Sequence, residues 1–248
     1  MPRFGCKTRR QRAIHVAGLD RHVSAQCRVG PSLRAYYDDL LAHFGPSGWW
    51  PGDTPFEVCV GAILTQNTAW ANVEKAIANL KRLRMMSAST ILAAPVDELE
   101  DALIPSGYFR VKSRRLRRFC EYLIDQHGGS VERMARTPIA VLRAQLLAVH
   151  GIGPETADDI LLYACDKPVF VVDTYTRRVF ARHGFVEPSV TYETLQEFLT
   201  SYLPEDLHLY KDYHAQIVNV GKEYCKPTPR CADCPLRHRL PPCGPVPL

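Results

Sequence analysis

Residues 146–164, LLAVHGIGPETADDILLYA, contain the feature that decides how the chain is interpreted. Apolar residues at helical spacing lie on both sides of Gly151 and Gly153, so the segment predicts two helices joined by a tight hairpin. Pro154 opens the second helix, whose first backbone N–H groups have no partner within the helix. Such a corner can bind a backbone phosphate of a nucleic acid without reading a base.

The helical pattern continues over most of the chain. Residues 55–83 predict two helices broken near Thr65–Thr68, and one short β-rich run, PVFVVD, occupies residues 168–173. We therefore expect an all-α fold with little or no sheet. None of the 248 residues belongs to an apolar run of about 20 residues, and the N-terminus lacks a secretion signal. We expect a cytoplasmic protein, at the nucleoid, with no membrane segment.

Basic residues are concentrated in two places rather than spread evenly. The chain has 31 Lys and Arg against 26 Asp and Glu, a net charge of only +5. Residues 1–34 carry eight basic residues and one Asp, and six basic residues lie between Arg110 and Arg118 without an acid. Each cluster alone is compatible with an ordinary solvated surface. Together with the hairpin they indicate a nucleic-acid partner, and Arg114 and Arg115 are candidate phosphate contacts.

Four of the nine cysteines lie close together near the C-terminus with the spacing C-x5-C-x2-C-x8-C. They are Cys225, Cys231, Cys234 and Cys243. A reducing cytoplasm disfavours disulfides, so this spacing indicates a metal site, either zinc or an iron–sulfur cluster. Lys226 and Arg230 lie between the first two cysteines. They are candidate phosphate contacts; the alternative is that they keep the loop soluble.

Five motifs, in this order, give the chain a family resemblance. They are PFEVCVGAILTQNT (55–68), SGYFRVKSRRL (106–116), HGIGPETAD (150–158), VVDTYTRRV (171–179) and CKPTPRCADCPL (225–236). Together they resemble the helix-hairpin-helix base-excision DNA glycosylases of the endonuclease III superfamily, over roughly residues 35–243. The family's cluster is a four-iron four-sulfur cluster, which the resemblance favours over zinc. The gap before Cys243 is longer than the family's usual five residues, which makes Cys243 the least secure ligand.

The resemblance also implies a two-lobed architecture with a C-terminal cluster loop. Residues 49–168 would form a helical barrel domain that ends in the helix-hairpin-helix. Residues 30–48 and 169–248 would form the cluster-containing helical domain, and residues 1–29 a basic, disordered N-terminal extension. The expected partner is double-stranded DNA containing a damaged base, bound by a monomer.

Three positions take roles from the resemblance. Asp173 is the candidate catalytic carboxylate, which would stabilise positive charge on the deoxyribose or deprotonate the attacking water; the alternative is a helix cap. Asn67 stands where endonuclease III has its gap-filling Gln, and Tyr108 stands where that enzyme has an apolar wedge. The alternatives are that Asn67 caps a helix and that Tyr108 belongs to the core.

Position 155 bears on the reaction type. Bifunctional members of the family have a lysine there that forms a Schiff base with the sugar, whereas this chain has Glu155. We therefore predict a monofunctional glycosylase that uses water and has weak or absent lyase activity. A carboxylate in the first turn of a helix is also favoured by the helix dipole alone. Lys112 and Lys167 remain open as alternative amines.

The substrate is the least determined part of the prediction. LTQNTAWANVEKAIANL (64–80) and the hairpin look most like the 3-methyladenine glycosylases built on the endonuclease III plan. A cationic alkylated purine leaves readily and suits a pocket with aromatic faces, for which Trp70 and Tyr175 are candidates beside Glu155. Open alternatives are oxidised pyrimidines, mismatched thymine or uracil, a catalytically silent damage-binding paralogue, and a zinc-stabilised binding module.

Overall fold

The computed structural model describes the backbone of residues 26–248 and the side chains from residue 32 onward. Most of the N-terminal extension predicted for residues 1–29 therefore lies outside the described residues. Between residues 26 and 248 the chain forms helices and loops, without a strand. Within that range, no helix combines the length and the apolar composition that crossing a lipid bilayer requires. The expected all-α fold is confirmed.

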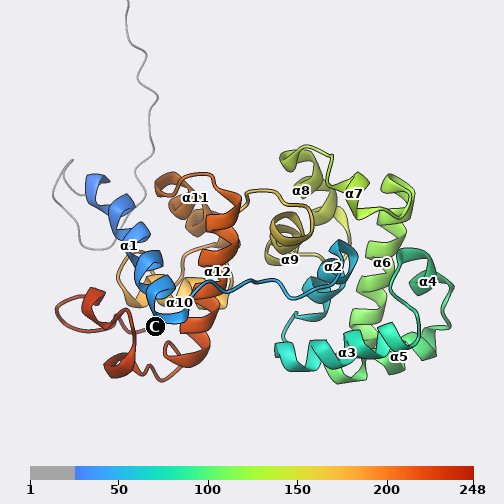
Figure 1. Ribbon diagram of the computed structural model, residues 1–248, viewed down its shortest axis with the longest axis horizontal. Helices are drawn as coiled ribbons and strands as arrows, with labels where there is room; N and C mark the ends of the chain where they lie inside the picture. Colours follow the sequence, from blue (N-terminus) through green and yellow to red (C-terminus); the bar gives the residue numbers. More distant parts are fainter. Residues whose placement is uncertain (1–25) are drawn as a thin grey trace, which may run out of the picture.

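The middle of the chain forms one group of helices around a shared apolar core (Figure 1). Its helices are α2 (Pro55–Leu64), α3 (Trp70–Arg82), α4 (Ala88–Ala93), α5 (Val96–Leu103), α6 (Phe109–His127), α7 (Val131–Met134), α8 (Ile139–Ala148) and α9 (Pro154–Asp159). Helix α2 is apolar on nearly all sides, and every residue from Glu57 to Leu64 is buried. An all-round apolar helix belongs at the centre of a core, and α2 accordingly contacts α3, α6, α7 and α9.

The two ends of the described chain form a second group of helices, on the left of Figure 1. These are α1 (Gln26–Phe44), α10 (Thr174–Arg182), α11 (Tyr192–Tyr202) and α12 (Leu207–Glu223). Helix α12 packs against both α1 and α10. Its Tyr213 is fully buried and donates a hydrogen bond to the carbonyl of Leu33 at 2.9 Å. Segments far apart in sequence are thereby joined into one unit.

The connection between the hairpin and α10 is irregular. After α9 the helix continues as one π-helical turn, η2 (Ile160–Ala164), whose residues are all buried. Residues 166–173 then have no regular secondary structure, with Phe170, Val171 and Val172 buried but not paired as a strand. The β-rich composition of this run therefore reflects its burial where the chain crosses between the two groups of helices, and not a strand.

Candidate active site

Asp173 is the last residue of that crossing and caps helix α10. Its Oδ1 accepts hydrogen bonds from the backbone N–H of Thr176 at 2.6 Å and from the Thr176 hydroxyl at 2.8 Å. Its Oδ2 lies 3.7 Å from Nε2 of His214, a residue of α12. Capping and catalysis are thus not exclusive, because the cap uses only one carboxylate oxygen.

The surroundings of Asp173 keep it ionised. Burial alone would raise its pKa, but the nearby His214 imidazole and the two hydrogen bonds from Thr176 outweigh burial and lower the pKa below its usual value. His214 is itself oriented by Tyr163 of η2, whose hydroxyl lies 2.7 Å from the His214 Nδ1. The carboxylate therefore contacts Thr176 of α10 and His214 of α12, and η2 orients the histidine.

Two further carboxyl groups lie near Asp173, and the pKa of each is raised. Glu155, in the first turn of α9, has an exposed side chain. The surrounding protein partly desolvates its carboxyl group, and this desolvation together with the charge of Asp173 raises its pKa to about 7. Asp159, one helical turn further on, is buried, and its Oδ1 has no hydrogen-bond partner among the described residues. Burial, Glu155 and Asp173 raise the pKa of Asp159 well above its usual range. The ionised Asp173 therefore lies near one carboxyl group that keeps its proton, Asp159, and one that titrates close to neutral pH, Glu155.

An aromatic cluster extends from this site. Trp50 meets Tyr163 at 5.3 Å and Trp70 at 5.3 Å between ring centroids, and Trp49 meets Trp70 at 5.6 Å. The cluster packs closely against Gly61 of α2, where an added Cβ would lie 3.1 Å from the Trp50 indole nitrogen. Trp70 was predicted as an aromatic wall; Trp49 and Trp50 were missed, because they lie in a Gly- and Pro-rich loop without periodicity.

Tyr175, the other predicted aromatic wall, makes no ring contact with this cluster. Its ring lies against Gly221 of α12, so closely that an added Cβ there would overlap it. Arg178 stacks on the same ring, with its guanidinium carbon 5.0 Å from the centroid. Tyr175 therefore packs α10 against α12, and its place in the pocket stays a prediction.

The hairpin glycines have different structural reasons. Gly151 has φ +96°, and an added Cβ would overlap the side chain of Arg115. Gly153 caps α9 with an extended backbone, and nothing lies within 4 Å of an added Cβ. Gln66 closes the corner: its Nε2 donates to the carbonyl of Gly151 at 3.0 Å and to the Thr156 hydroxyl at 2.9 Å, and Arg115 donates to its Oε1.

The sequence matches the HhH-GPD superfamily of base excision DNA repair proteins over residues 60–205. The chain belongs to this superfamily. A Methanocaldococcus jannaschii protein assigned to the DNA repair glycosylases is 43% identical over 203 residues, 81% of this chain and 92% of the relative. Endonuclease III of Thermotoga maritima is 32% identical over 185 residues, covering 74% and 81%.

Two solved structures extend this comparison. A non-covalent endonuclease III–DNA complex has a TM-score of 0.72 and 26% identity, covering 86% of this chain and 95% of that one. A Helicobacter pylori 3-methyladenine DNA glycosylase bound to 1,N6-ethenoadenine has a TM-score of 0.66 and 28% identity, covering 79% and 96%. The two-lobed endonuclease III fold expected from sequence is confirmed, and the chain is a DNA glycosylase of the base excision repair type.

Two turns of this HhH-GPD protein carry the predicted gap-filling residues. Asn67 and Tyr108 both adopt left-handed backbone conformations, with φ of 53° and 44°. The Asn67 side chain is exposed and caps no helix, and Tyr108 is 72% exposed rather than part of the core. Both structural alternatives are thus excluded, while contact with DNA stays a prediction.

Lys112 joins these two turns and is not free to act as a nucleophile. Its buried Nζ donates to the carbonyls of Leu64 and Ser106, each at 2.7 Å, and to the hydroxyl of Thr68. Burial and the charge of Arg115 lower its pKa to about 8. The amine uses its three hydrogen bonds to hold the two turns in position.

A lysine that sequence reasoning missed lies close enough to Asp173 to feel its charge. Lys222, close to the end of α12, places its Nζ 5.3 Å from the ring centroid of Trp49. Burial lowers its pKa, and the charge of Asp173 acts in the opposite direction. No motif marks this residue; only the packing of α12 brings it to the site.

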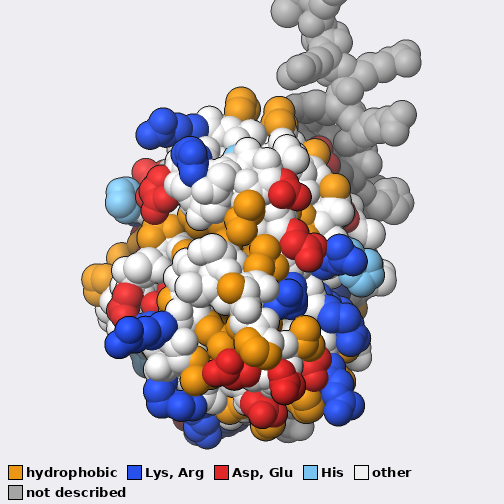
Figure 2. All heavy atoms as spheres, turned by 90° about the vertical axis from the view of Figure 1, so that its right-hand side faces the viewer, with side chains coloured by type: hydrophobic (Ala, Val, Ile, Leu, Met, Phe, Trp, Pro, Cys, Tyr) orange, Lys and Arg blue, Asp and Glu red, His pale blue; other side chains and the backbone are white. Residues whose placement is uncertain are grey.

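The basic run on α6 proves to be divided between several uses. Arg117 donates to carbonyls of residues 91–94, and Arg110 and Arg118 pair with Glu100 and Glu121. Arg115 is engaged with Gln66, which leaves Arg114 exposed and without an ion pair among the described residues. On the face over α3–α6, basic side chains alternate with acidic ones (Figure 2). Charge density in the sequence therefore overstated the free positive surface.

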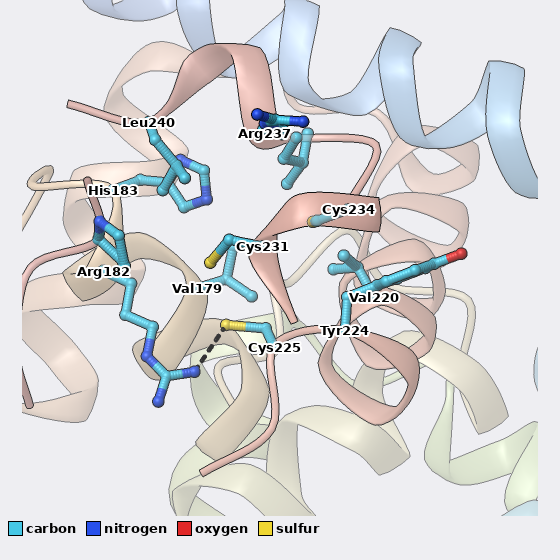
Figure 3. A pocket seen from close by; sticks show the side chains of 12 residues that line it. Val179, Arg182, His183, Val220, Tyr224, Cys225, Cys231, Cys234, Arg237 and Leu240 are labelled. Atoms are coloured by element: carbon cyan, nitrogen blue, oxygen red, sulfur yellow. Dashed lines mark hydrogen bonds between the residues drawn. The ribbon is translucent and has the colours of Figure 1, made fainter. Parts of the chain in front are cut away.

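Three of the four C-terminal cysteines converge on one pocket (Figure 3). Cys225, Cys231 and Cys234 line it, and Arg182 donates a hydrogen bond to the Cys225 sulfur at 3.3 Å. Cys243 is exposed and does not line the pocket. Three thiols with a guanidinium beside them suit a thiolate-bound group, whereas the predicted fourth ligand does not fit. Lys226 and Arg230 of the intervening loop are exposed, as a phosphate contact requires.

Proposed function

We propose that this protein is a monofunctional DNA glycosylase that binds double-stranded DNA as a monomer and hydrolyses the bond between a flipped, damaged base and its sugar. The observation that carries the proposal is the ionised Asp173 carboxylate beside an aromatic cluster, with a carboxylate at position 155. Breaking the bond develops positive charge on the sugar, which the carboxylate stabilises electrostatically. Its free Oδ2 can also accept a proton from the attacking water.

We propose that the hairpin and the two gap-filling residues predicted from the sequence bind the DNA. The hairpin at Gly151 and Gly153 offers backbone N–H groups to a phosphate. Asn67 and Tyr108 project from neighbouring turns and would fill the space left by the extruded nucleotide. The glycosylase structures that resemble this chain include an endonuclease III–DNA complex, which supports this arrangement. Residues 49–168 and the flanking segments would form the two lobes on either side of the bound base.

An alkylated purine is the substrate class that the site favours. Trp49, Trp50 and Trp70 offer π-faces, and a cationic base is attracted both to such faces and to the Glu155 carboxylate. An N-alkylated purine already carries the positive charge that makes it a good leaving group, so the site needs no strong general acid. The resemblance to a 3-methyladenine glycosylase bound to ethenoadenine supports this class.

A lesion panel tests activity and substrate together. Duplexes each carrying one defined lesion would be incubated with the protein, and free base and alkali-labile sites would be measured. We expect release of 3-methyladenine or ethenoadenine. Release restricted to uracil, thymine or an oxidised pyrimidine would refute the alkylpurine preference. Binding without release from any duplex would refute the enzyme itself.

Borohydride trapping tests the water mechanism separately. With Glu155 in the lysine position and Lys112 bound to carbonyls, we expect no covalent enzyme–DNA adduct, while an endonuclease III forms one in parallel. An adduct would contradict the mechanism, and its loss in Lys222→Gln would identify the attacking amine. If the wild type forms no adduct, Lys222→Gln should form none either.

We also propose that the cysteine pocket holds a four-iron four-sulfur cluster in preference to zinc. Relatives named endonuclease III support this by family. Within residues 26–248, no three His, Cys, Asp or Glu side chains are arranged to close on a single ion. When bound, the group would pin both ends of the loop that carries Lys226 and Arg230.

A further inference from the structure

The cysteine pocket contains a histidine that can complete its ligand set. We propose that His183 is the fourth ligand beside Cys225, Cys231 and Cys234, and that Cys243 is not a ligand. This inference rests on the proposed cluster and concerns only which side chains of this chain hold it.

The path of the chain takes Cys243 away from the pocket. The family's usual gap of five residues after Cys234 would place a ligand at position 240, which here is Leu240, a residue that does line the pocket. The chain then makes a turn in which the N–H of Gly244 donates to the carbonyl of Pro241 at 2.8 Å. Cys243 lies in this turn and is exposed. The pocket position of the fourth cysteine is therefore occupied by an apolar side chain.

The chain returns to the pocket only after Cys243. The N–H of Val246 donates to the carbonyl of Arg182 at 2.9 Å, and Pro245 lines the pocket. These contacts fix the segment on both sides of the turn, so bringing the Cys243 sulfur inward would require breaking them.

His183 faces the same pocket from the end of α10. It follows Arg182, the donor to Cys225, and lines the pocket together with the three cysteines. In the view of Figure 3 its ring lies beside Leu240, with the Cys231 sulfur between it and Cys225. The imidazole thus lines the same pocket as Leu240, the side chain that replaces the family's fourth cysteine.

Hydrogen bonds determine which nitrogen of His183 is available. The Tyr36 hydroxyl has one hydrogen, which it donates to the carbonyl of Arg239 at 3.0 Å. Its 2.8 Å contact with Nδ1 of His183 must therefore use a hydrogen on Nδ1, with the phenol oxygen as acceptor. In the neutral ring this leaves the lone pair on Nε2.

This arrangement is the one that a metal-binding histidine requires. Such a histidine binds through one nitrogen while its other N–H donates to an oxygen that fixes the tautomer and the ring plane. Histidine also replaces cysteine on iron in one class of iron–sulfur cluster, where it raises the reduction potential.

The test compares metal content in matched variants of the full chain. Iron, acid-labile sulfide and zinc per chain and the visible absorption would be measured after anaerobic purification. We expect Cys243→Ser to match the wild type, His183→Ala to lose at least half of the metal, and His183→Cys to restore it. Circular dichroism verifies that each variant is folded. Tyr36→Phe, which removes the acceptor for the Nδ1 hydrogen, should lose metal to an intermediate extent.

Spectroscopy on the wild type provides a test that does not depend on any variant's stability. With nitrogen-15 histidine incorporated, the reduced cluster should show nitrogen hyperfine coupling that is absent in His183→Cys, whose reduction potential should be lower. Loss of metal in Cys243→Ser with retention in His183→Ala, or retention in both, overturns the assignment. A zinc ion lost only from His183→Ala supports the ligand set and refutes the cluster. A wild type without metal refutes both.

Discussion

The Nε2 of His214 lies 3.7 Å from Oδ2 of Asp173, while its Nδ1 contacts the hydroxyl of Tyr163 at 2.7 Å. One imidazole from α12 therefore lies between the Asp173 carboxylate, the candidate catalytic group, and Tyr163 of the aromatic cluster. Its contribution to Asp173 can be measured, because it is among the groups that lower the carboxyl pKa against the opposing effect of burial.

Removing His214 should narrow the acidic range of activity. In His214→Ala the pKa of Asp173 rises, so the carboxylate becomes protonated at a higher pH and the acid limb of the pH–rate profile moves to higher pH.

Asp173→Asn should lose about a hundredfold or more in base release at every pH and retain DNA binding, since its amide oxygen can still cap α10. Single-turnover rates from pH 4 to 8 test both. An unshifted limb would contradict the role of His214, and an active Asp173→Asn would contradict that of Asp173.

Glu155 should make excision of a cationic base depend on pH near neutrality. Its pKa of about 7 means that the side chain is increasingly ionised as the pH rises through 7. Only the anion attracts a cationic base, so wild-type affinity for the alkylated duplex should rise from pH 6 to 8. Glu155→Gln should remove this rise and leave binding of an undamaged duplex unchanged. A rise of equal size in the variant would show that another group is responsible.

The two hairpin glycines should differ in their tolerance of alanine. At Gly151 an added methyl meets both a positive φ and the side chain of Arg115, a combination that costs of order 1–3 kcal/mol. At Gly153 the backbone is extended and the space is open, so alanine should fold normally. Urea denaturation of Gly151→Ala and Gly153→Ala measures the difference. Equal stabilities would mean that the hairpin relaxes around the substitution.

Apolar periodicity predicted the helices on either side of Thr65–Thr68 correctly, because a buried helix face is a one-dimensional pattern. The segment after Pro154 was expected as one continuous helix, and the π-helical turn at residues 160–164 has no sequence signature. The contact of His214 with Tyr163 joins residues 51 positions apart. Only tertiary packing creates it, as it creates the burial of Lys112 among carbonyls within a run that looked like a charged surface.

Arg114 should contribute to DNA affinity and Arg118, four residues along α6, should not. Arg114 is exposed without an ion pair among the described residues, whereas Arg118 is paired with Glu121 at 3.0 Å. Each phosphate contact contributes about 0.9 to the slope of log affinity against log salt. Arg114→Ala should reduce this slope by about that amount, equally for different sequences, and Arg118→Ala should leave it nearly unchanged. A sequence-selective loss would indicate base contact instead.

Asp159 should destabilise the fold progressively as the pH rises. Its pKa in the folded protein lies well above 3.8, its usual value, so between these two values the folded state binds more protons than the unfolded state. The free energy of unfolding therefore falls with rising pH over that window, by up to about 1.4 kcal/mol per pH unit. Asp159→Asn removes the titrating group and should be more stable than the wild type at pH 8 and closer to it at pH 4. Asp125→Asn, at an exposed position, serves as the control and should follow the wild type. If Asp159→Asn keeps the wild-type pH dependence, the buried carboxyl is compensated by a partner and does not hold its proton.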